Sequence, residues 1–421
     1  MILELFNNLF FKEKGVNMRI WEPELIALPI PKNASDASIE IELTVYVINN
    51  TLESVRLHPN DALMPELITS KGQILQPEVA IEESLKNLEK IQAIRRRALG
   101  GRFPLTRWLS NLVFRLRRPP KIINLDDSLI EPGEGKKTSP IVRLLWYNNK
   151  LQLKFIKQFS YLPVSFKLND SWCFHDLQAD TYQLRFTRKS SSDRTSADLN
   201  PETKTEAIAP ALATQFLSLS LQEPVGPDNS AVEVNGIRFE TLVPQPRVIV
   251  PRSQPNVRVR NPRLDPYTLV EIGIRISNNT SSCFRFNLFA SLIPQLIGTD
   301  GQPIEAAYGC SLTIIPKESD FPIVKPGESL TFFPKIAQLF WVKGELFCLS
   351  IPAGDGGGWV FGSLSLGTYQ INFIYKNQDR TVEILDKEGR NAKLLEDIWV
   401  GMVFTPSITF SLVRSETEKI L

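Results

Sequence analysis

The amino-acid sequence predicts a mainly β protein of two tandem β-sandwich domains, the first of which carries an inserted αα-hairpin. Three observations support this fold. Hydrophobic residues alternate with polar residues along many short segments, turn-forming residues separate these segments, and the two halves of the chain resemble each other. With 421 residues, of which 43% are hydrophobic, the chain is long enough to form two cores.

The alternation of hydrophobic residues predicts strands in both halves of the chain. A period of two is typical of a strand with one buried face. Turn residues such as Asn49-Asn50 and Pro132-Gly133 separate the predicted strands. Many short strands joined by such turns indicate a β-sandwich. The alternating hydrophobic positions are Ile39, Ile41, Leu43, Val45 and Val47, then Val270, Ile272, Ile274 and Ile276, and then Tyr369, Ile371, Phe373 and Tyr375.

An internal duplication relates the two halves. Residues 41–75 align with residues 270–304 without a gap and with eleven identities. The match resumes at residues 131–134 against 325–328, and again at 172–186 against 359–373. This period is much longer than the 20–50 residues of solenoid repeats. We therefore expect two homologous domains in tandem.

Two matched segments predict tyrosine corners, in which a tyrosine hydroxyl bonds to upstream backbone. They are Leu177-x-x-Asp-Thr-Tyr182 and Leu364-x-x-Gly-Thr-Tyr369. This feature is typical of immunoglobulin-like sandwiches. Neither copy has a cysteine two residues after the tyrosine, so we expect packing alone to stabilise each domain, with Trp172 and Trp359 as core anchors.

A set of motifs in the second copy carries a family resemblance. The motifs are NNT at 278–280, LIPxLIGxDG at 292–301, DFxxVxPGESLTFF at 320–333, GTYQ at 367–370 and W-x-G at 399–401. With them the chain resembles an uncharacterised family of immunoglobulin-like proteins found mainly in cyanobacteria, and more loosely the intracellular (BsuPI-like) proteinase inhibitors. The first copy lacks W-x-G and has DDSLI in place of DFPIV. The resemblance implies an immunoglobulin-like fold and supplies no catalytic residues.

The predicted domain boundaries follow from the duplication and from local composition. We expect an N-terminal leader at 1–17, a first sandwich at 18–222, a linker at 223–231, a second sandwich at 232–414 and a C-terminal tail at 415–421. The first dozen residues fit either a short amphipathic helix or an unstructured leader ahead of a true start at Met18. Residues 188–211 read as a flexible loop, and the proline-rich and arginine-rich segment 244–266 as an edge strand or an extended connector.

Candidate chemical sites do not match known spacings. Cys173, Cys283, Cys310 and Cys348 form no CxxC pair, and neither His58 nor His175 has a counterpart in the second copy. The GDGGGW segment at 354–359 lacks phosphate-loop spacing and is better explained as a turn. The Asn-x-Thr sequences also read as turns. We therefore predict no enzymatic activity, no metal and no cofactor, and, since no secretory signal or membrane span is found, a cytoplasmic location.

A basic stretch interrupts the first copy. Residues 94–121 contain eight arginines and one lysine with no acidic residue, whereas the rest of the chain has 39 basic and 46 acidic residues and a net charge of −7. Residues 77–121 fit an αα-hairpin: Pro77 and early glutamates begin one helix, Gly100-Gly101 ends it, and Pro104 begins a second helix with an apolar arc around Trp108. This arc fits either packing on the sandwich or docking on a partner.

These features predict a non-enzymatic adaptor or assembly protein. The basic hairpin would dock on an acidic protein partner or on an anionic lipid surface at the cytoplasmic face of a membrane, and nucleic acid ranks third. Two alternatives stay open: a binding module similar to proteinase inhibitors, and a hydrolase with an unrecognised site. The predicted partner-binding residues are Arg95, Arg96, Arg97, Arg102, Arg107, Trp108, Arg115, Arg117 and Arg118.

Overall fold

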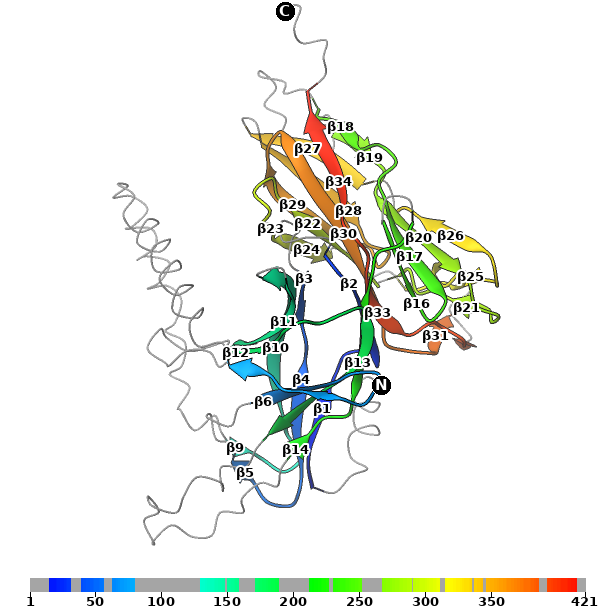
Figure 1. Ribbon diagram of the computed structural model, residues 1–421. Coiled ribbons are helices and arrows are strands. Elements are labelled where there is room, and N and C mark those ends of the chain that lie inside the picture. Colours follow the sequence, from blue (N-terminus) through cyan, green and yellow to red (C-terminus); the bar gives the residue numbers. More distant parts are fainter. Residues whose placement is uncertain are drawn as a thin grey trace, which may run out of the picture.

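The computed structural model of the chain is mainly β (Figure 1). It describes residues 15–31, 39–56, 63–79, 129–147, 150–158, 171–188, 212–226, 230–251, 267–289, 291–310, 315–334, 337–343, 346–385 and 392–414. Within these residues the only helical element is a 3₁₀ turn, η2 (Glu318–Asp320). No helix among them is long and apolar enough to cross a membrane. The predicted mainly β class is confirmed.

The strands form two lobes, an N-lobe of β1 to β15 and a C-lobe of β16 to β34. One layer of the N-lobe is a seven-stranded sheet in the order β1 (Gly15–Ile20), β4 (Val45–Asn50), β10 (Gly135–Tyr147), β11 (Lys150–Gln158), β12 (Ser171–Phe174) and β8 (Glu78–Val79), with β3 (Ile39–Glu42) also paired to β10. The corresponding layer of the C-lobe is split in two. One sheet is β16 (Ala231–Val234), β17 (Ile237–Leu242), β20 (Gly273–Asn278) and β26 (Ser329–Phe332), and the other is β19 (Tyr267–Val270), β27 (Ala337–Lys343), β28 (Leu346–Pro352), β29 (Gly357–Leu364) and β24 (Ala306–Cys310).

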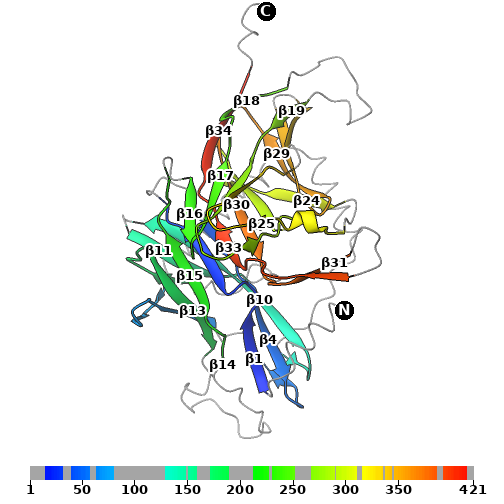
Figure 2. The same ribbon diagram turned by 90° about the vertical axis from the view of Figure 1, so that its right-hand side faces the viewer.

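A single twelve-stranded sheet runs through both lobes (Figures 1 and 2). Its order is β18 (Arg247–Ile249), β34 (Ile408–Val413), β30 (Gly367–Asn377), β33 (Gly401–Phe404), β2 (Leu25–Pro29), β15 (Leu217–Gln222), β13 (Asp180–Arg188), β6 (Leu63–Ile68) and β7 (Ile74–Leu75), with β14 (Leu212–Ala213), β22 (Leu292–Ile297) and β23 (Pro303–Ile304) at its margins. Three small ladders complete the fold: β5 (Val55–Arg56) with β9 (Leu129–Ile130), β21 (Phe284–Arg285) with β25 (Ile323–Val324), and β31 (Val382–Leu385) with β32 (Ala392–Leu395).

The lobes join where β2 of the N-lobe pairs in parallel with β33 of the C-lobe, Ile26 opposite Met402 and Ala27 opposite Val403. Successive side chains of a strand point to opposite faces of its sheet. Accordingly Ile26, Met402 and Phe404 lie in the N-lobe core, whereas Ala27 and Val403 lie in the C-lobe core. Each of the two junction strands therefore contributes to both cores.

Polar contacts reinforce this junction. The carboxylate of Glu22, whose side chain is only 2% exposed, pairs with the ammonium group of Lys376 at 2.5 Å, and Glu22 also accepts a hydrogen bond from the backbone of Thr44. Gln378 donates to the backbone oxygen of Trp21 at 2.6 Å. Lys376 lies near the end of the C-lobe strand β30, and Gln378 directly follows that strand. These bonds therefore connect the two lobes beside the shared sheet.

Two buried asparagines that the duplication matches make the same contacts in each lobe. Asn49 is fully buried and donates to the carbonyl oxygens of Glu53 and Ile130, while its own side-chain oxygen accepts from Thr51. Asn278 is likewise buried and donates to Ser282 and Val324 while accepting from Thr280. Both asparagines clamp a turn, as the sequence predicted, and their amides are fully engaged.

Both predicted tyrosine corners are confirmed. The Tyr182 hydroxyl donates to the carbonyl oxygen of Gln178 and accepts from its backbone N–H, both at 3.1 Å. The Tyr369 hydroxyl does the same with Ser365, at 2.8 and 2.9 Å. Trp172 is buried in the N-lobe core, and Trp359 packs partly buried against the C-lobe core.

The W-x-G motif of the second copy also has a packing reason. Trp399 is buried among Phe239, Phe286 and Tyr375, with ring centroids 5.1 to 6.4 Å from theirs. A Cβ atom at Gly401 would lie 2.4 Å from the Trp399 ring. Only glycine fits beneath the indole.

Several predicted boundaries need correction. Strand β1 begins at Gly15, inside the predicted leader 1–17, because Gly15 to Ile20 pair along β4. Strand β16 begins at Ala231, inside the predicted linker 223–231, and Val225 bridges to Ala231. The predicted loop 188–211 is shorter at its start, because Arg188 is the last residue of β13. Of the segment 244–266, Arg247–Ile249 forms the predicted edge strand. Residues 1–14, 189–211, 252–266 and 415–421 lie outside the described residues.

Candidate functional site

The basic insertion is described only at its two ends. The nine predicted partner-binding residues, Arg95, Arg96, Arg97, Arg102, Arg107, Trp108, Arg115, Arg117 and Arg118, all lie outside the described residues. The chain enters this region from β8 and returns at β9. Both strands belong to the N-lobe, since β8 pairs with β12 and β9 pairs with β5. The insertion is therefore anchored on the N-lobe at both ends.

The expected helix does not begin at Pro77. Glu78 and Val79 form strand β8, in which Glu78 is opposite Cys173 and Val79 is opposite Trp172. Backbone pairing at the sheet edge holds these two residues extended, which overrides the helix-start signal of a proline followed by glutamate. The rest of the predicted hairpin, 80–121, lies outside the described residues.

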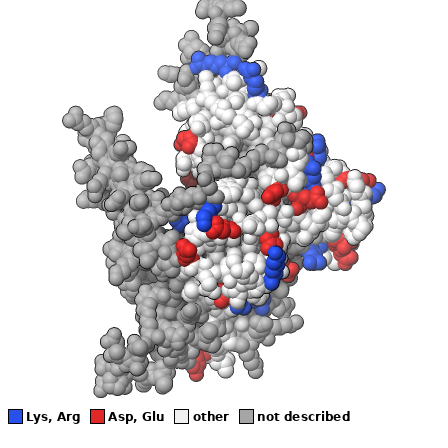
Figure 3. All heavy atoms as spheres, viewed as in Figure 1, with Lys and Arg blue, Asp and Glu red and all other residues white. Residues whose placement is uncertain are grey.

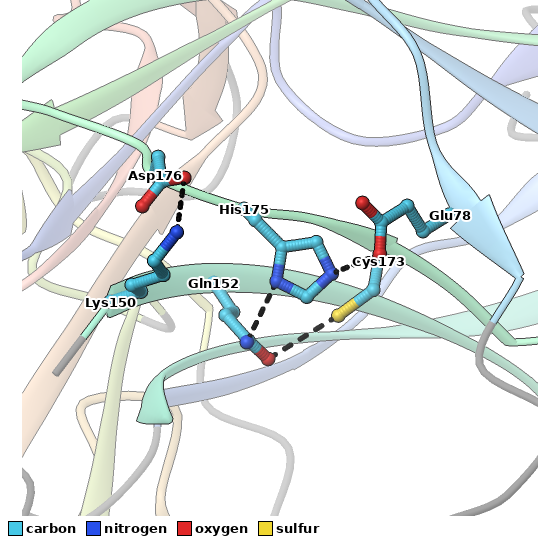
Figure 4. Close-up of polar contacts among 6 residues, drawn as sticks. All are labelled: Glu78, Lys150, Gln152, Cys173, His175 and Asp176. Atoms are coloured by element: carbon cyan, nitrogen blue, oxygen red, sulfur yellow. Dashed lines mark hydrogen bonds and ion pairs between the residues drawn. The ribbon is translucent and has the colours of Figure 1, made fainter. Parts of the chain in front are cut away.

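A chain of polar side chains connects β8 to the N-lobe sheet (Figure 4). We call Glu78, Gln152, Cys173 and His175 the root cluster. The thiol of Cys173 donates to Gln152 Oε1 at 3.4 Å, and Gln152 Nε2 lies 2.8 Å from His175 Nδ1. The other ring nitrogen, His175 Nε2, lies 3.3 Å from a carboxylate oxygen of Glu78.

These contacts define the hydrogen-bond directions. A Gln152 amide that accepts from the thiol through its oxygen must donate through its nitrogen, so Nδ1 of His175 accepts and Nε2 carries the proton. That N–H then points to the Glu78 carboxylate. Because an amide lies between Cys173 and His175, the imidazole does not contact the thiol as a general base would have to.

Burial supports a structural role for the inner half of the root cluster. Cys173 is 4% exposed and Gln152 is 6% exposed. His175 and Glu78 lie further out, with side chains 29% and 78% exposed. The cluster therefore runs across the sheet face opposite the core, from two buried side chains on β11 and β12 to the exposed Glu78 of β8, and it supports the pairing of β8 with β12.

A second pair beside the cluster fixes the bend after β12. The ammonium group of Lys150 lies 2.8 Å from the carboxylate of Asp176. Asp176 has a positive φ of 57°, and Ser363, its match in the C-lobe, has a φ of 60°. The bend belongs to both copies, whereas its ion pair belongs to the N-lobe alone, because Leu346 takes the place of Lys150.

Sequence reasoning missed the root cluster. The sequence showed only that His175 has no counterpart in the second copy, whereas the structure places it half-buried and in contact with both Gln152 and Glu78. The available signal was the alternation of Cys173 and His175 on one face of a predicted strand. Glu78 could not be added to it, because the sequence assigned Glu78 to a helix.

Figure 3 shows how the charged side chains of the described residues are distributed over one face of the molecule. The surface drawn there is mostly uncharged, with Lys and Arg side chains beside Asp and Glu over much of it and a group of basic side chains alone at the upper end. Within the described ranges no three His, Cys, Asp or Glu side chains converge as metal ligands.

Comparisons of this chain with protein-family models, curated proteins and solved structures found no match.

Proposed function

We propose that this protein is an adaptor or assembly factor that acts by binding, and that its basic insertion docks on an acidic protein or on an anionic lipid surface. One observation carries the proposal: residues 94–121 hold nine cations and no acidic residue in a chain whose remainder has a net charge of −7. Several arginines near an anionic leaflet contribute about 1 kcal/mol each, more than isolated surface ion pairs do.

The root cluster supports this proposal. Backbone pairing at both ends fixes where a docking segment leaves the body of the protein. Strand β8 pairs with β12 and is bonded through the His175–Glu78 contact, and β9 is bonded to β5. In this proposal the two lobes are immunoglobulin-like sandwiches, the insertion forms the αα-hairpin that its sequence pattern favours, and the protein acts in the cytoplasm or peripherally at the membrane.

The test neutralises the charge of the insertion within the full chain. In one variant the eight arginines of 94–121 and Lys121 become glutamine, and in a matched control the arginines become lysine. Flotation is measured with vesicles of phosphatidylcholine alone and with about one third phosphatidylserine, and protein partners are compared by pull-down with and without nuclease.

The glutamine variant should lose flotation with the anionic vesicles or lose the acidic protein partners, while the lysine control keeps most of the binding. Raising the salt concentration should weaken what is bound, because exposed charges are screened. Retention of every partner and of flotation by the glutamine variant would contradict the proposal. Partners that disappear only after nuclease treatment would replace it with nucleic-acid binding.

A further inference from the structure

A groove of about 580 Å³ lies where the two lobes meet. Its floor includes Gln295 of β22, Gln370 and Asn372 of β30 and Thr409 of β34. Neighbouring residues of these strands, such as Ile371 and Phe410, face the C-lobe core, so the floor is the opposite face of the shared sheet. One wall is β3 of the N-lobe, and the volume is typical of ligand sites, which also favour domain junctions.

The described charges in the groove lining are both negative. They are Glu40 and Glu42, at alternate positions of β3 and therefore on one face of that strand. Glu40 is paired with Arg143 of β10. Glu42 is exposed, and no cation among the described residues pairs with it. A ligand with a cationic group near Glu42 would be favoured over a neutral or an anionic ligand.

The floor offers neutral hydrogen-bonding groups. Asn372 Nδ2 donates to Gln295 Oε1 at 3.2 Å, and this bond uses neither the Asn372 oxygen nor the Gln295 nitrogen. Side-chain amides pair a donor with an acceptor, as each backbone peptide group does. The remaining Asn372 oxygen and Gln295 nitrogen are one acceptor and one donor, which is the pair that a peptide group of a ligand requires.

Strand edges border the groove as well. Among the described strands, β3 pairs with β10 alone, and β22 is covered on its outer side by β23 only at Leu296 and Ile297. Extended peptides bind proteins by adding to such edges, with pockets for alternate side chains giving specificity. Ile293, Ile304 and Trp359 supply apolar surface in the lining.

From these observations we propose that the groove binds an extended peptide segment of another protein, with a Lys or Arg side chain placed at Glu42. The proposal rests on the junction of the lobes and is independent of what the basic insertion does. Residues of the lining and of the insertion can therefore be tested separately.

The test uses two labelled decapeptides, one alternating lysine and valine and one alternating glutamine and valine, titrated against the full chain by fluorescence polarisation. The lysine peptide should bind at least about ten-fold more tightly than the glutamine peptide. Glu42→Gln should weaken the lysine peptide about ten-fold, because the cation loses its partner. The matched control is Glu271→Gln, since Glu271 is the exposed residue that aligns with Glu42 in the C-lobe and lies outside the groove lining.

A second variant, Gln295→Lys, places a cation on the groove floor and should abolish binding of the lysine peptide. Neutralising the arginines of the insertion should leave that binding unchanged, which separates this proposal from the proposed function. Equal affinity for the two peptides, an equal loss in Glu271→Gln, or undiminished binding in Gln295→Lys would each overturn the proposal. Binding of a neutral hexasaccharide in place of the peptides would assign the groove to another ligand class.

Discussion

The same sheet face differs sharply between the two lobes. Strand pairing places Leu153 opposite Phe174 in the N-lobe and Leu349 opposite Phe361 in the C-lobe, which aligns the strands residue by residue. On the outward face the N-lobe has Lys150, Gln152, Cys173 and His175, where the C-lobe has Leu346, Cys348, Val360 and Gly362. The inward positions agree much more closely, as Trp172 with Trp359 and Tyr182 with Tyr369 show.

This difference separates framework from function. Inward residues are constrained by packing, turn clamps and corners in both lobes, so they stayed alike. Outward positions are not constrained by packing in the core. In the N-lobe these positions hold the root cluster, next to the start of the insertion. The C-lobe exposes apolar side chains on the same face, Leu269 at 48% and Leu346 at 41%. We therefore look for the N-lobe's particular function on its outer face.

Because the junction strands contribute to both cores, we expect the two lobes to unfold together. The mutation with the largest predicted effect tests this expectation. Phe404→Ala should cost about 3–5 kcal/mol, because this C-lobe residue is fully buried in the N-lobe core. Calorimetry and urea unfolding should show one transition for both lobes, shifted as a unit. Phe361→Ala, a change within the C-lobe core alone, is the matched control and should shift the same transition. Two separate transitions would show that the lobes fold independently.

The ion pair at the junction should show the next largest effect. Lys376→Met leaves the buried Glu22 carboxylate without its partner and should cost about 3 kcal/mol in the free energy of unfolding. Glu22→Gln should cost about 1 kcal/mol, because Lys376 is 29% exposed and its ammonium group can turn toward water. Urea unfolding of both variants checks the order. A larger loss for Glu22→Gln would contradict the burial of the carboxylate.

The turn clamps give a direct test of likeness between the lobes. Asn49→Ala and Asn278→Ala should each cost about 2 kcal/mol, since each removes one donated bond to a buried carbonyl oxygen and a second one to a carbonyl oxygen of the exposed turn. Thermal unfolding under one set of conditions gives both values. Leu52→Ala, at a 98% exposed position of the first turn, is the control for the turn sequence. Effects that differ by more than about 1 kcal/mol would mean that the two clamps are not equivalent.

The tyrosine corners should give a small loss, similar to that of Glu22→Gln. Tyr182→Phe and Tyr369→Phe should each cost about 1 kcal/mol at neutral pH, because each removes a hydroxyl that bonds upstream backbone.

Burial also raises the pKa of Tyr182 and of Tyr375 above the ordinary value of 10.0. Their protonated forms therefore stabilise the fold fully below about pH 10, and this contribution is lost as the pH rises through the folded-state pKa values.

Urea unfolding above about pH 10 checks the alkaline part of this prediction. The intact protein should lose stability steeply there, and Tyr375→Phe, which has no titrating group at that position, should lose it less steeply. Equal slopes for the two proteins would contradict the assignment to the buried phenol.

Local features of the fold could be predicted from the sequence. The asparagine clamps and tyrosine corners depend on bonds between residues close in the chain, so short motifs reveal them. The sequence did not predict that one sheet runs through both lobes, because the strands that join them, β2 and β33, are far apart in sequence. A signal was nevertheless present: Leu25–Pro29 and Gly401–Phe404 are uninterrupted apolar runs, which are typical of strands buried on both faces.

The root cluster was beyond sequence reasoning for a related reason. Its partners come from three strands, and Glu78 looked like the start of a helix until its pairing with β12 was known. The charge of the insertion, in contrast, can be read directly from the sequence without knowledge of the fold. The proposed function therefore depends on the amino-acid composition of the insertion, whereas the attachment of the insertion to the N-lobe could be recognised only from the strand pairing of β8 and β9.

A chimera of the full chain tests the central claim most directly. Residues 311–322 connect β24 to β25 in the C-lobe, where the N-lobe has the much longer connection from β8 to β9. Replacing residues 82–128 with this C-lobe connection should leave the unfolding temperature close to that of the intact protein and remove binding to anionic vesicles or acidic partners. A folded chimera that keeps all of this binding would contradict the claim that the insertion is the docking element.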